Sequence, residues 1–173
     1  MNQEQIILKK LSAADIEKVR VWRNQEFVRQ HMEYQKIISK EEQLVWFEKI
    51  NSDASFQYFL VVCNEKPIGL IHLGNINKDT KSADVGLFIG EQDYLGTGAA
   101  LAASIKILDL AFVSFELENL FAKVNSINIK VKEYNSFLGF VFDKKLSPSF
   151  EQWKIDKPTY FGKRERLQRL DKK

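Results

Sequence analysis

The sequence has little cysteine and no long apolar run. Its one cysteine, Cys63, excludes an internal disulfide and a multi-cysteine metal site, which fits a reducing compartment; we expect no bound metal. The longest apolar run, Tyr58 to Cys63, is far shorter than the about 20 residues that a membrane-spanning helix needs. The start, Met1 to Gln5, lacks the basic and apolar regions of a signal peptide. We therefore expect a cytoplasmic protein without a membrane partner.

Proline is also scarce, and the sequence contains no internal repeat or low-complexity segment. The three prolines and the absence of repeats leave no linker that would divide the 173 residues. Hydrophobic residues make up 45% of the chain, which is enough to form a core and argues against disorder. We expect residues 1–173 to form a single domain.

An excess of charge of one sign is confined to the carboxy-terminal end. Between Lys163 and Lys173 there are six basic and two acidic residues, so the rest of the chain is close to neutral. Nucleic-acid binding needs a basic surface, so we expect no nucleic-acid partner. For the basic tail 163–173 the first expectation is a frayed, solvated segment, although Leu167 and Leu170 would also allow a short helix.

The first third of the chain predicts one strand followed by two helices. The strand is expected at Ile6 to Leu11, and a capping box of Ser12 and Asp15 follows it. A second capping box, Ser39 with Glu42, precedes apolar residues at helical spacing. These signals predict a helix after each box.

The remainder alternates between strands and helices. Residues 56–63, 68–75 and 83–89 predict an antiparallel meander. A helix is expected after the glycine pair, then a strand at 120–125, a helix at 127–138 and a strand at 139–142. After Pro148 the sequence fits either a strand hairpin or a strand followed by a helix.

The segment Gly96-Thr97-Gly98 lies between a predicted strand and a predicted helix. Glycines allow close approach of a ligand, and the free N–H groups of a helix start attract phosphate. Two glycines also form ordinary turns, so the motif alone leaves both interpretations open. No Gly-Lys-Ser/Thr follows, which excludes a Walker loop, and Leu101 replaces the third glycine of a dinucleotide fingerprint.

Three segments carry a resemblance, together with the order of the elements. These segments are Asp84 to Ile89, the turn Asp93-Tyr94-Leu95-Gly96-Thr97-Gly98, and Asn128 followed by Leu138-Gly139-Phe140. In these features the sequence resembles the GNAT superfamily of N-acetyltransferases. The family's turn begins with Gln or Arg, and here that position is Asp93. The resemblance implies an α/β fold with a mixed, mostly antiparallel sheet of six to seven strands and about four helices. It also implies acetyl-coenzyme A as the acetyl donor. The residues implied to bind it are Gly86, Leu87, Phe88, Ile89, Leu95, Gly96, Thr97, Gly98, Ala99, Ala100, Asn128 and Asn135.

Acetyl transfer to an amine needs a base and a proton donor for the leaving thiolate. Asp84 stands where many relatives carry a glutamate, and His72 in the neighbouring strand is a second candidate base; each could instead be structural. Aligning Gly139 with the family pattern places Asn135 where many relatives carry a tyrosine that acts as the general acid. Tyr134, one position away, would replace that tyrosine only if the helix were rotated, because neighbouring helical residues point about 100° apart.

The amino-terminal pattern narrows the resemblance. It consists of Val21-Trp22-Arg23-Asn24, Val28 to Met32, and Trp46-Phe47. This pattern is similar to that of GNAT members that acetylate nucleotide-linked amino-deoxy sugars, as in pseudaminic acid synthesis. A guanidinium suits a diphosphate, and a methionine or aromatic side chain suits a flat base. The candidate substrate-binding residues are Arg23, Asn24, His31 and Met32.

The sequence therefore predicts an acetyl-coenzyme A-dependent N-acetyltransferase that acts on a small amine, with a nucleotide sugar as the first hypothesis. A protein N-terminal acetyltransferase is the alternative within enzymes, and an acyl-coenzyme A-binding module without catalysis is the alternative of another class. A homodimer is possible if the carboxy-terminal strands pair between subunits.

Overall fold

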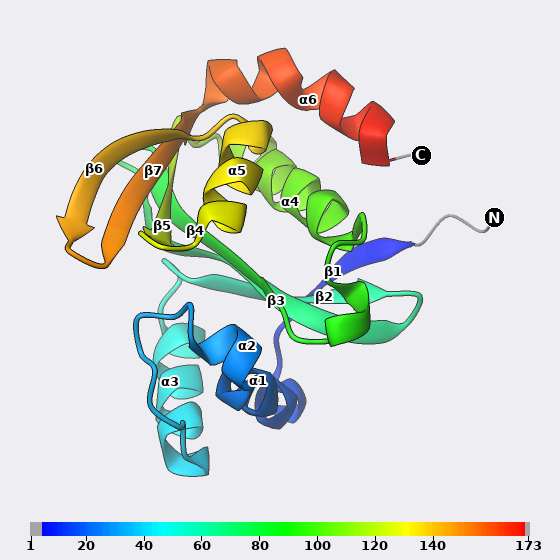
Figure 1. The fold of residues 1–173 in the computed structure, drawn as a ribbon, viewed down its shortest axis with the longest axis vertical. Coiled ribbons are helices and arrows are strands. Elements are labelled where there is room, and N and C mark those ends of the chain that lie inside the picture. Colours follow the sequence, from blue (N-terminus) through cyan, green and yellow to red (C-terminus); the bar gives the residue numbers. More distant parts are fainter. Residues whose placement is uncertain (1–4, 172–173) are drawn as a thin grey trace.

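A seven-stranded sheet in the order β1-β2-β3-β4-β5-β7-β6 forms the centre of the computed structural model, which describes residues 5–171 (Figure 1). Every neighbouring pair is antiparallel except β4 and β5, which are parallel. The sheet confirms the predicted mixed, mostly antiparallel architecture. The strands are β1 (Ile6–Lys10), β2 (Gln57–Cys63), β3 (Lys66–Asn77), β4 (Ser82–Ile89), β5 (Asn119–Asn125), β6 (Val141–Ser147) and β7 (Phe150–Asp156).

Within residues 5–171, six α-helices flank the sheet, where about four were expected. One of the additional helices is a single turn, α2, and the other, α6, occupies the segment that the sequence left open. The helices are α1 (Ile16–Asn24), α2 (Glu26–Arg29), α3 (Lys40–Ser52), α4 (Ala99–Asp109), α5 (Ile129–Leu138) and α6 (Lys157–Asp171). Short 3-10 turns, η1 (Ala13–Asp15) and η2 (Gln92–Tyr94), precede α1 and α4, and a π-helical turn, η3 (Leu110–Ser114), ends α4.

The helices divide between the two faces of the sheet, with α1 to α3 on one face and α4 to α6 on the other (Figure 1). Each face has its own apolar cluster because successive side chains of a strand point in opposite directions. Along β2, Leu60 and Val62 belong to the cluster under α1 and α3, whereas Val61 and Cys63 belong to the cluster under α4. The apolar run of β2 is therefore shared between two cores.

The two predicted capping boxes are both present. In α3, the Glu42 backbone N–H donates to Ser39 Oγ at 3.1 Å, and Ser39 N–H donates to the Glu42 carboxylate at 2.7 Å. At Ser12 the backbone N–H donates to the Asp15 carboxylate at 3.1 Å, but this box opens only the turn η1 that leads into α1. The local signals thus located both helix starts.

The strand predicted at 139–142 begins two residues later and is longer. Gly139 has a φ of +111°, and its N–H, like that of Phe140, donates to the Asn135 carbonyl, which closes α5. A left-handed glycine after the last turn is a common helix end. Strand β6 therefore starts at Val141 and continues through Ser147.

The expectation of a frayed basic tail is wrong for the described part of the chain, 163–171, while residues 172 and 173 lie outside it. Helix α6 packs on α4: the Arg164 guanidinium donates to both Asp109 carboxylate oxygens at 2.7 and 3.0 Å, and Leu167 is 2% exposed. Tyr160 is fully buried and donates its hydroxyl to Asp109 at 2.7 Å. The ion pair with Asp109 and the buried Leu167 therefore hold this basic segment in a packed helix.

Within residues 5–171, no helix is long and apolar enough to cross a membrane.

Candidate active site

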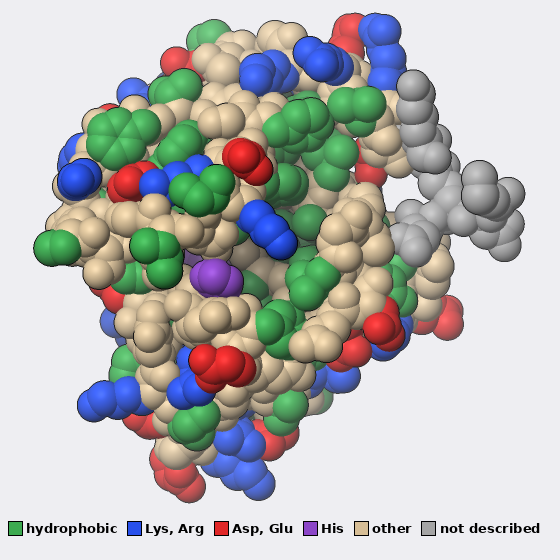
Figure 2. Space-filling view, in the orientation of Figure 1, with side chains coloured by type: hydrophobic (Ala, Val, Ile, Leu, Met, Phe, Trp, Pro, Cys, Tyr) green, Lys and Arg blue, Asp and Glu red, His purple; other side chains and the backbone are tan. Residues whose placement is uncertain are grey.

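The site begins where β4 and β5 separate. The two strands pair only from Ser82 to Asp84 on β4 and from Asn119 to Phe121 on β5. Beyond Asp84, β4 runs on to Ile89 and still pairs with β3, but this part of β4 pairs with no other strand among residues 5–171. Backbone N–H and C=O groups at such an opening can bind an extended polar ligand. In the space-filling view, the face shown is hollowed near its centre, between the helices above and the strands below (Figure 2).

The glycine turn leads from this opening into α4. Gly96 has a φ of +75°, a conformation that favours glycine, and added Cβ atoms at Gly96 and Gly98 would meet nothing within 4 Å. Thr97 fixes the turn, because its hydroxyl donates to the Tyr94 carbonyl at 2.9 Å and accepts from the Ala99 N–H at 3.2 Å. The turn therefore presents the N-terminus of an 11-residue helix with open space in front of it, as a phosphate site requires.

Asp84 lies at the point of separation. Its carboxylate accepts a hydrogen bond of 2.6 Å from the Asn75 side-chain amide, and it is partly exposed. Asn75 has a φ of +51° and lies where the β3–β4 register shifts. Asp84 and Gly86 point to the same face of the sheet, so Asp84 lies diagonally from His72, which pairs with Gly86. The structure thus brings the two predicted bases to one face at the opening.

His72 is enclosed between its neighbours on β2 and β4. Its ring stacks on Tyr58, with centroids 4.6 Å apart and planes at 10°, and a Cβ at Gly86 would clash with the imidazole. Burial lowers the pKa of His72 to about 4, so the imidazole is neutral near pH 7. A base with this pKa accepts a proton only weakly, although it can accept a hydrogen bond from an amine.

Tyr134 on α5 is bound to α4. Its hydroxyl lies 3.0 Å from the Ala100 carbonyl and 2.8 Å from Ser104 Oγ, and burial raises its pKa to about 12. Asn135 is buried, and its backbone carbonyl ends the helix. Asn128 caps α5 by accepting a hydrogen bond from the Val131 N–H at 3.2 Å. All three residues have structural contacts on the side of the sheet that carries the glycine turn.

Three polar side chains fix the segment 30–39, which follows α2. The Asn24 side-chain amide makes two hydrogen bonds with the backbone of Ile38. It accepts from the Ile38 N–H at 2.8 Å and donates to the Ile38 carbonyl at 3.0 Å. Arg20 also donates to the Ile38 carbonyl at 3.0 Å, and Arg29 donates to the Gln35 carbonyl at 3.0 Å. The segment is thus held by side chains of α1 and α2. The substrate contact predicted for Asn24 stays a prediction.

The other candidate substrate residues lie in the same region. His31 is exposed and Met32 is partly exposed at the start of the segment 30–39. Arg23 is partly buried, and its Nη1 atom has no hydrogen-bond partner among residues 5–171. Trp22 is 2% exposed and donates its indole N–H to Glu91 at 2.9 Å, so it is a core residue.

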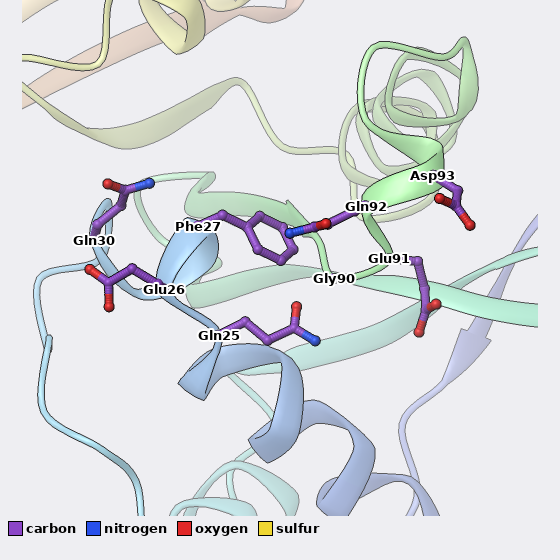
Figure 3. A pocket seen from close by; sticks show the side chains of 8 residues that line it. All are labelled: Gln25, Glu26, Phe27, Gln30, Gly90, Glu91, Gln92 and Asp93. Atoms are coloured by element: carbon purple, nitrogen blue, oxygen red, sulfur yellow. The ribbon is translucent and has the colours of Figure 1, made fainter.

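A cleft of about 690 Å³ separates α2 from the end of β4 (Figure 3). Phe27 and Gln92 point toward one another across it, and the buried Oε1 of Gln25 has no partner in the described part of the chain. The cleft adjoins η2, which leads into the glycine turn. Its lining residues are Gln25, Glu26, Phe27, Gln30, Gly90, Glu91, Gln92 and Asp93.

A known protein family matches most of the chain. The family described as "Acetyltransferase (GNAT) domain" matches residues 5–141. The chain belongs to this family. It is therefore an N-acetyltransferase that uses acetyl-coenzyme A, which confirms the donor expected from the resemblance. Among residues 5–171, no group of three or more His, Cys, Asp and Glu side chains could hold a metal ion.

Two curated relatives are similar to this GNAT acetyltransferase over most of their length. Acetyltransferase PseH of Campylobacter jejuni subsp. jejuni serotype O:23/36 (strain 81-176) is 34% identical over 137 residues, which cover 78% of this chain and 83% of the relative. Acetyltransferase PseH of serotype O:2 is 33% identical over the same shares.

Solved structures share the fold at lower identity. Spermidine N-acetyltransferase from Vibrio cholerae in complex with CoA and spermine has a TM-score of 0.82 at 23% identity, covering 91% of this chain and 98% of that chain. A domain from Methanocaldococcus jannaschii has a TM-score of 0.80 at 18% identity, covering 88% and 99%. These likenesses confirm the fold.

Tyr58 is the residue of this region that sequence reasoning missed. It lies in the apolar run of β2 and looks like a core residue, yet its ring stacks on His72 and meets Trp46 edge-on at 5.1 Å. Its place depends on the pairing of β2 with β3, which no local motif specifies. An aromatic side chain directly opposite a histidine in a predicted hairpin is the signal that could have found it.

Proposed function

We propose that this acetyltransferase transfers the acetyl group of acetyl-coenzyme A to the amino group of a nucleotide-linked amino-deoxy sugar. The observation that carries the proposal is the 34% identity with Acetyltransferase PseH over 78% of the chain. It agrees with the resemblance of the amino-terminal pattern to acetyltransferases of pseudaminic acid synthesis.

For the donor, we propose the residues that the opening and the glycine turn expose. The open edge of β4 from Gly86 to Ile89 and the backbone of Leu95 to Ala100 fit an extended arm followed by a pyrophosphate, since space is open at both glycines. Asn128 and Asn135 on α5 lie on the same side of the sheet. Acetyl-coenzyme A would supply the acetyl group as a thioester.

For proton removal, we propose Asp84, directly or through water, with His72 as a neutral hydrogen-bond acceptor for the amine. Asp84 lies at the opening and is partly exposed, whereas the low pKa of His72 makes it the weaker base. Backbone N–H groups of β4 would polarise the thioester carbonyl.

For protonation of the leaving thiolate, three sources stay open: Tyr134, water ordered by Asn135, and solvent. The Tyr134 hydroxyl is held by α4, and burial raises its pKa to about 12. Catalytic acids work best with a pKa near the operating pH, so the buried phenol is a weak acid at neutral pH.

For the acceptor, we propose the side of the sheet under α1 to α3. Met32 and His31 stand on the segment 30–39, and Arg23 holds a guanidinium nitrogen without a partner. Asn24 would act mainly by fixing this segment.

We also propose that residues 1–173 form one domain that acts in the cytoplasm. A homodimer through the carboxy-terminal strands stays a prediction; β6 is the last strand of the sheet, and its pairing with β7 is interrupted by two register shifts.

Thiol release from acetyl-coenzyme A, measured over UDP- and dTDP-linked amino sugars, amino-terminal peptides and spermidine, tests the proposal. Turnover with one nucleotide sugar is the expected result. Turnover with peptides alone would favour the alternative function, a protein N-terminal acetyltransferase. Tight binding of acetyl-coenzyme A without turnover on any acceptor would favour the non-catalytic alternative.

The base is tested separately with Asp84→Asn. We expect turnover to fall and the acidic limb of the pH–rate profile to change, because the amide cannot take a proton. An unchanged profile and an unchanged turnover would exclude Asp84 as the base.

A further inference from the structure

A carboxylate at the end of β4 connects elements from both faces of the sheet. Glu91 comes directly before η2, and each of its carboxylate oxygens has its own partner. Oε1 accepts from the Trp22 indole N–H at 2.9 Å, and Oε2 lies 3.3 Å from the Lys66 ammonium. Trp22 belongs to α1, and Lys66 is the first residue of β3. Glu91 thus joins a helix of one face to the segment that leads into α4 on the other face (Figure 1).

The hydrogen bond from Trp22 is the stronger of the two contacts. Trp22 is 2% exposed, and a hydrogen bond to an ionised acceptor is roughly twice as strong as one between neutral groups. This bond is the first cause that holds the pKa of Glu91 below its ordinary value, so Glu91 is ionised at neutral pH. The Lys66 side chain is 49% exposed, and an exposed ion pair contributes little. The contact with α1 therefore fixes the Glu91 side chain.

Gly90 allows this contact to form. A Cβ added at Gly90 would clash with the Trp22 ring, so the ring packs directly against the Gly90 backbone. The backbone N–H groups of Gly90 and Glu91 both donate to the Ile68 carbonyl, at 2.8 and 3.1 Å. The chain therefore leaves β4 at a fixed place against α1.

A series of contacts continues from Glu91 to the first residue of α4. The Tyr94 N–H donates to the Glu91 carbonyl at 3.1 Å, and the Lys66 ammonium lies 5.3 Å from the centre of the Tyr94 ring. The Tyr94 carbonyl accepts from the Thr97 hydroxyl, and the same hydroxyl accepts from the Ala99 N–H. Glu91 and the start of α4 are thus connected through hydrogen bonds alone.

The position of the glycine turn is set by its two ends. The turn is open on its outer side, because added Cβ atoms at Gly96 and Gly98 would meet nothing within 4 Å. One end is the buried start of α4, where Ala99 is 1% exposed, and the other end is η2, which Glu91 holds. Groups that bind a ligand must be held within about 0.5 Å of the productive geometry. A displaced η2 would therefore weaken phosphate binding by the turn.

We propose that Glu91 is a positioning residue of the donor site: through its bond to α1, it holds the glycine turn where the N–H groups of the turn meet the pyrophosphate of acetyl-coenzyme A. This inference rests on the donor site proposed above. Glu91 acts through the turn and not on the donor, because both of its carboxylate oxygens are engaged by protein groups. Since Trp22 belongs to the apolar cluster under α1 and α3, the turn is positioned from the face of the sheet proposed for the acceptor.

The test compares coenzyme A with pantetheine, which has the same thiol arm but lacks the pyrophosphate and the adenosine. Calorimetry gives the Kd of coenzyme A directly and that of pantetheine by displacement. In Glu91→Ala we expect the Kd of coenzyme A to rise roughly 5- to 20-fold, because the turn is misplaced, and the Kd of pantetheine to change less than about twofold. Glu91→Gln keeps an oxygen for the indole N–H, so its Kd for coenzyme A should rise less than about threefold.

Two further variants and a melting curve keep the test specific. Glu65→Gln changes an exposed carboxylate between β2 and β3 and is the matched control, with no expected change in either Kd. Trp22→Phe keeps a ring against Gly90 but removes the N–H donor, and it should reproduce the effect of Glu91→Ala on coenzyme A. The melting temperature of each variant shows that it is folded at the temperature of the binding measurements.

Gly98→Asp separates the inference from the proposed donor site. The new carboxylate would stand in open space at the start of α4 and repel a pyrophosphate, so we expect the Kd of coenzyme A to rise at least about tenfold. If Gly98→Asp weakens coenzyme A binding but Glu91→Ala and Trp22→Phe do not, the donor site stands and the inference is wrong. An equal rise of both Kd values in Glu91→Ala would also overturn the inference, because pantetheine lacks the group that the turn binds. If Gly98→Asp leaves coenzyme A binding unchanged, the proposed donor site fails, and the inference fails with it.

Discussion

The two sides of the sheet differ in how completely their buried polar groups are paired. Under α4 to α6, buried or partly buried polar side chains are bonded to one another, as in Tyr134 with Ser104 and Arg164 with Asp109. Under α1 to α3, polar atoms such as Arg23 Nη1 stay without partners in the described chain. The side under α1 to α3 therefore holds more unpartnered buried polar atoms than the side that faces the glycine turn.

This difference indicates where stability and specificity lie. A side whose buried polar groups are hydrogen-bonded and well packed contributes most to the free energy of unfolding. Unpaired buried polar groups on the other side lower that free energy and stay available for binding. Substitutions on the α4 side should therefore change stability first, and substitutions on the α1 side should change acceptor kinetics first.

The largest expected effect is on the α4 side. Tyr160→Ala removes a fully buried ring that stacks on Phe112 at 5.3 Å and donates to Asp109. We expect a loss of about 3–5 kcal/mol in the free energy of unfolding, measured in urea. Phe161→Ala is the control, because that ring is 42% exposed. A loss below about 1 kcal/mol for Tyr160→Ala would remove α6 from the stabilising core.

The second prediction concerns pH and His72. The folded pKa of about 4 lies below the ordinary histidine pKa of 6.5, so the unfolded chain binds the extra proton first as pH falls. Stability from this group is complete above about pH 6.5 and decreases between pH 6.5 and 4, by up to about 3 kcal/mol. Urea unfolding at several pH values should show this decrease in the wild type and a smaller one in His72→Gln.

His31→Gln, at an exposed histidine, is the matched control for that experiment. Equal pH dependence in the wild type and in His72→Gln would mean that His72 is not the enclosed neutral imidazole described here.

The third prediction separates structure from catalysis at Tyr134. Tyr134→Phe loses the hydroxyl contacts with Ala100 and Ser104, so we expect about 1 kcal/mol of destabilisation and a decrease in kcat of less than tenfold. Ser104→Ala removes one of these contacts and is the matched variant. A decrease of a hundredfold or more in Tyr134→Phe alone would identify the phenol as the proton donor.

The smallest expected effect lies at a contact between the two sides. Lys123 on β5 pairs with Glu33 of the segment 30–39 at 2.9 Å, and both side chains are substantially exposed. A double-mutant cycle with Lys123→Ala and Glu33→Ala should give an interaction energy of about 0.2–1 kcal/mol that decreases with salt. A larger, salt-independent value would show that the segment 30–39 is anchored more firmly than its exposure indicates.

Much of the fold could be predicted from local patterns. The capping boxes located two helix starts, and the three-strand meander followed from alternating β-rich segments and turns. Helix α6 was harder to predict from the sequence, because its packing depends on Asp109, about 50 residues earlier in the chain. A charge-rich segment looks solvated until its partner is known.

The candidate site was predictable where it depends on the main chain and less so where it depends on side chains. Gly96 and Gly98 marked the turn, because their conformation and open space are properties of the motif itself. The contact of His72 with Tyr58 depends on strand register, and the missing partner of Arg23 depends on the whole tertiary structure. No spacing in the sequence encodes an absent partner.

The short parallel ladder between β4 and β5 has a consequence for how the enzyme can evolve. The opening beyond Asp84 is lined by backbone amides, and a substitution changes a side chain without removing an amide. The proposed donor side can therefore tolerate sequence drift outside positions such as Gly86 and Gly96, where a glycine is needed, as long as the strands still diverge. The proposed acceptor side relies on single side chains, so one or two exchanges there would be enough to give descendants of the same scaffold different substrates.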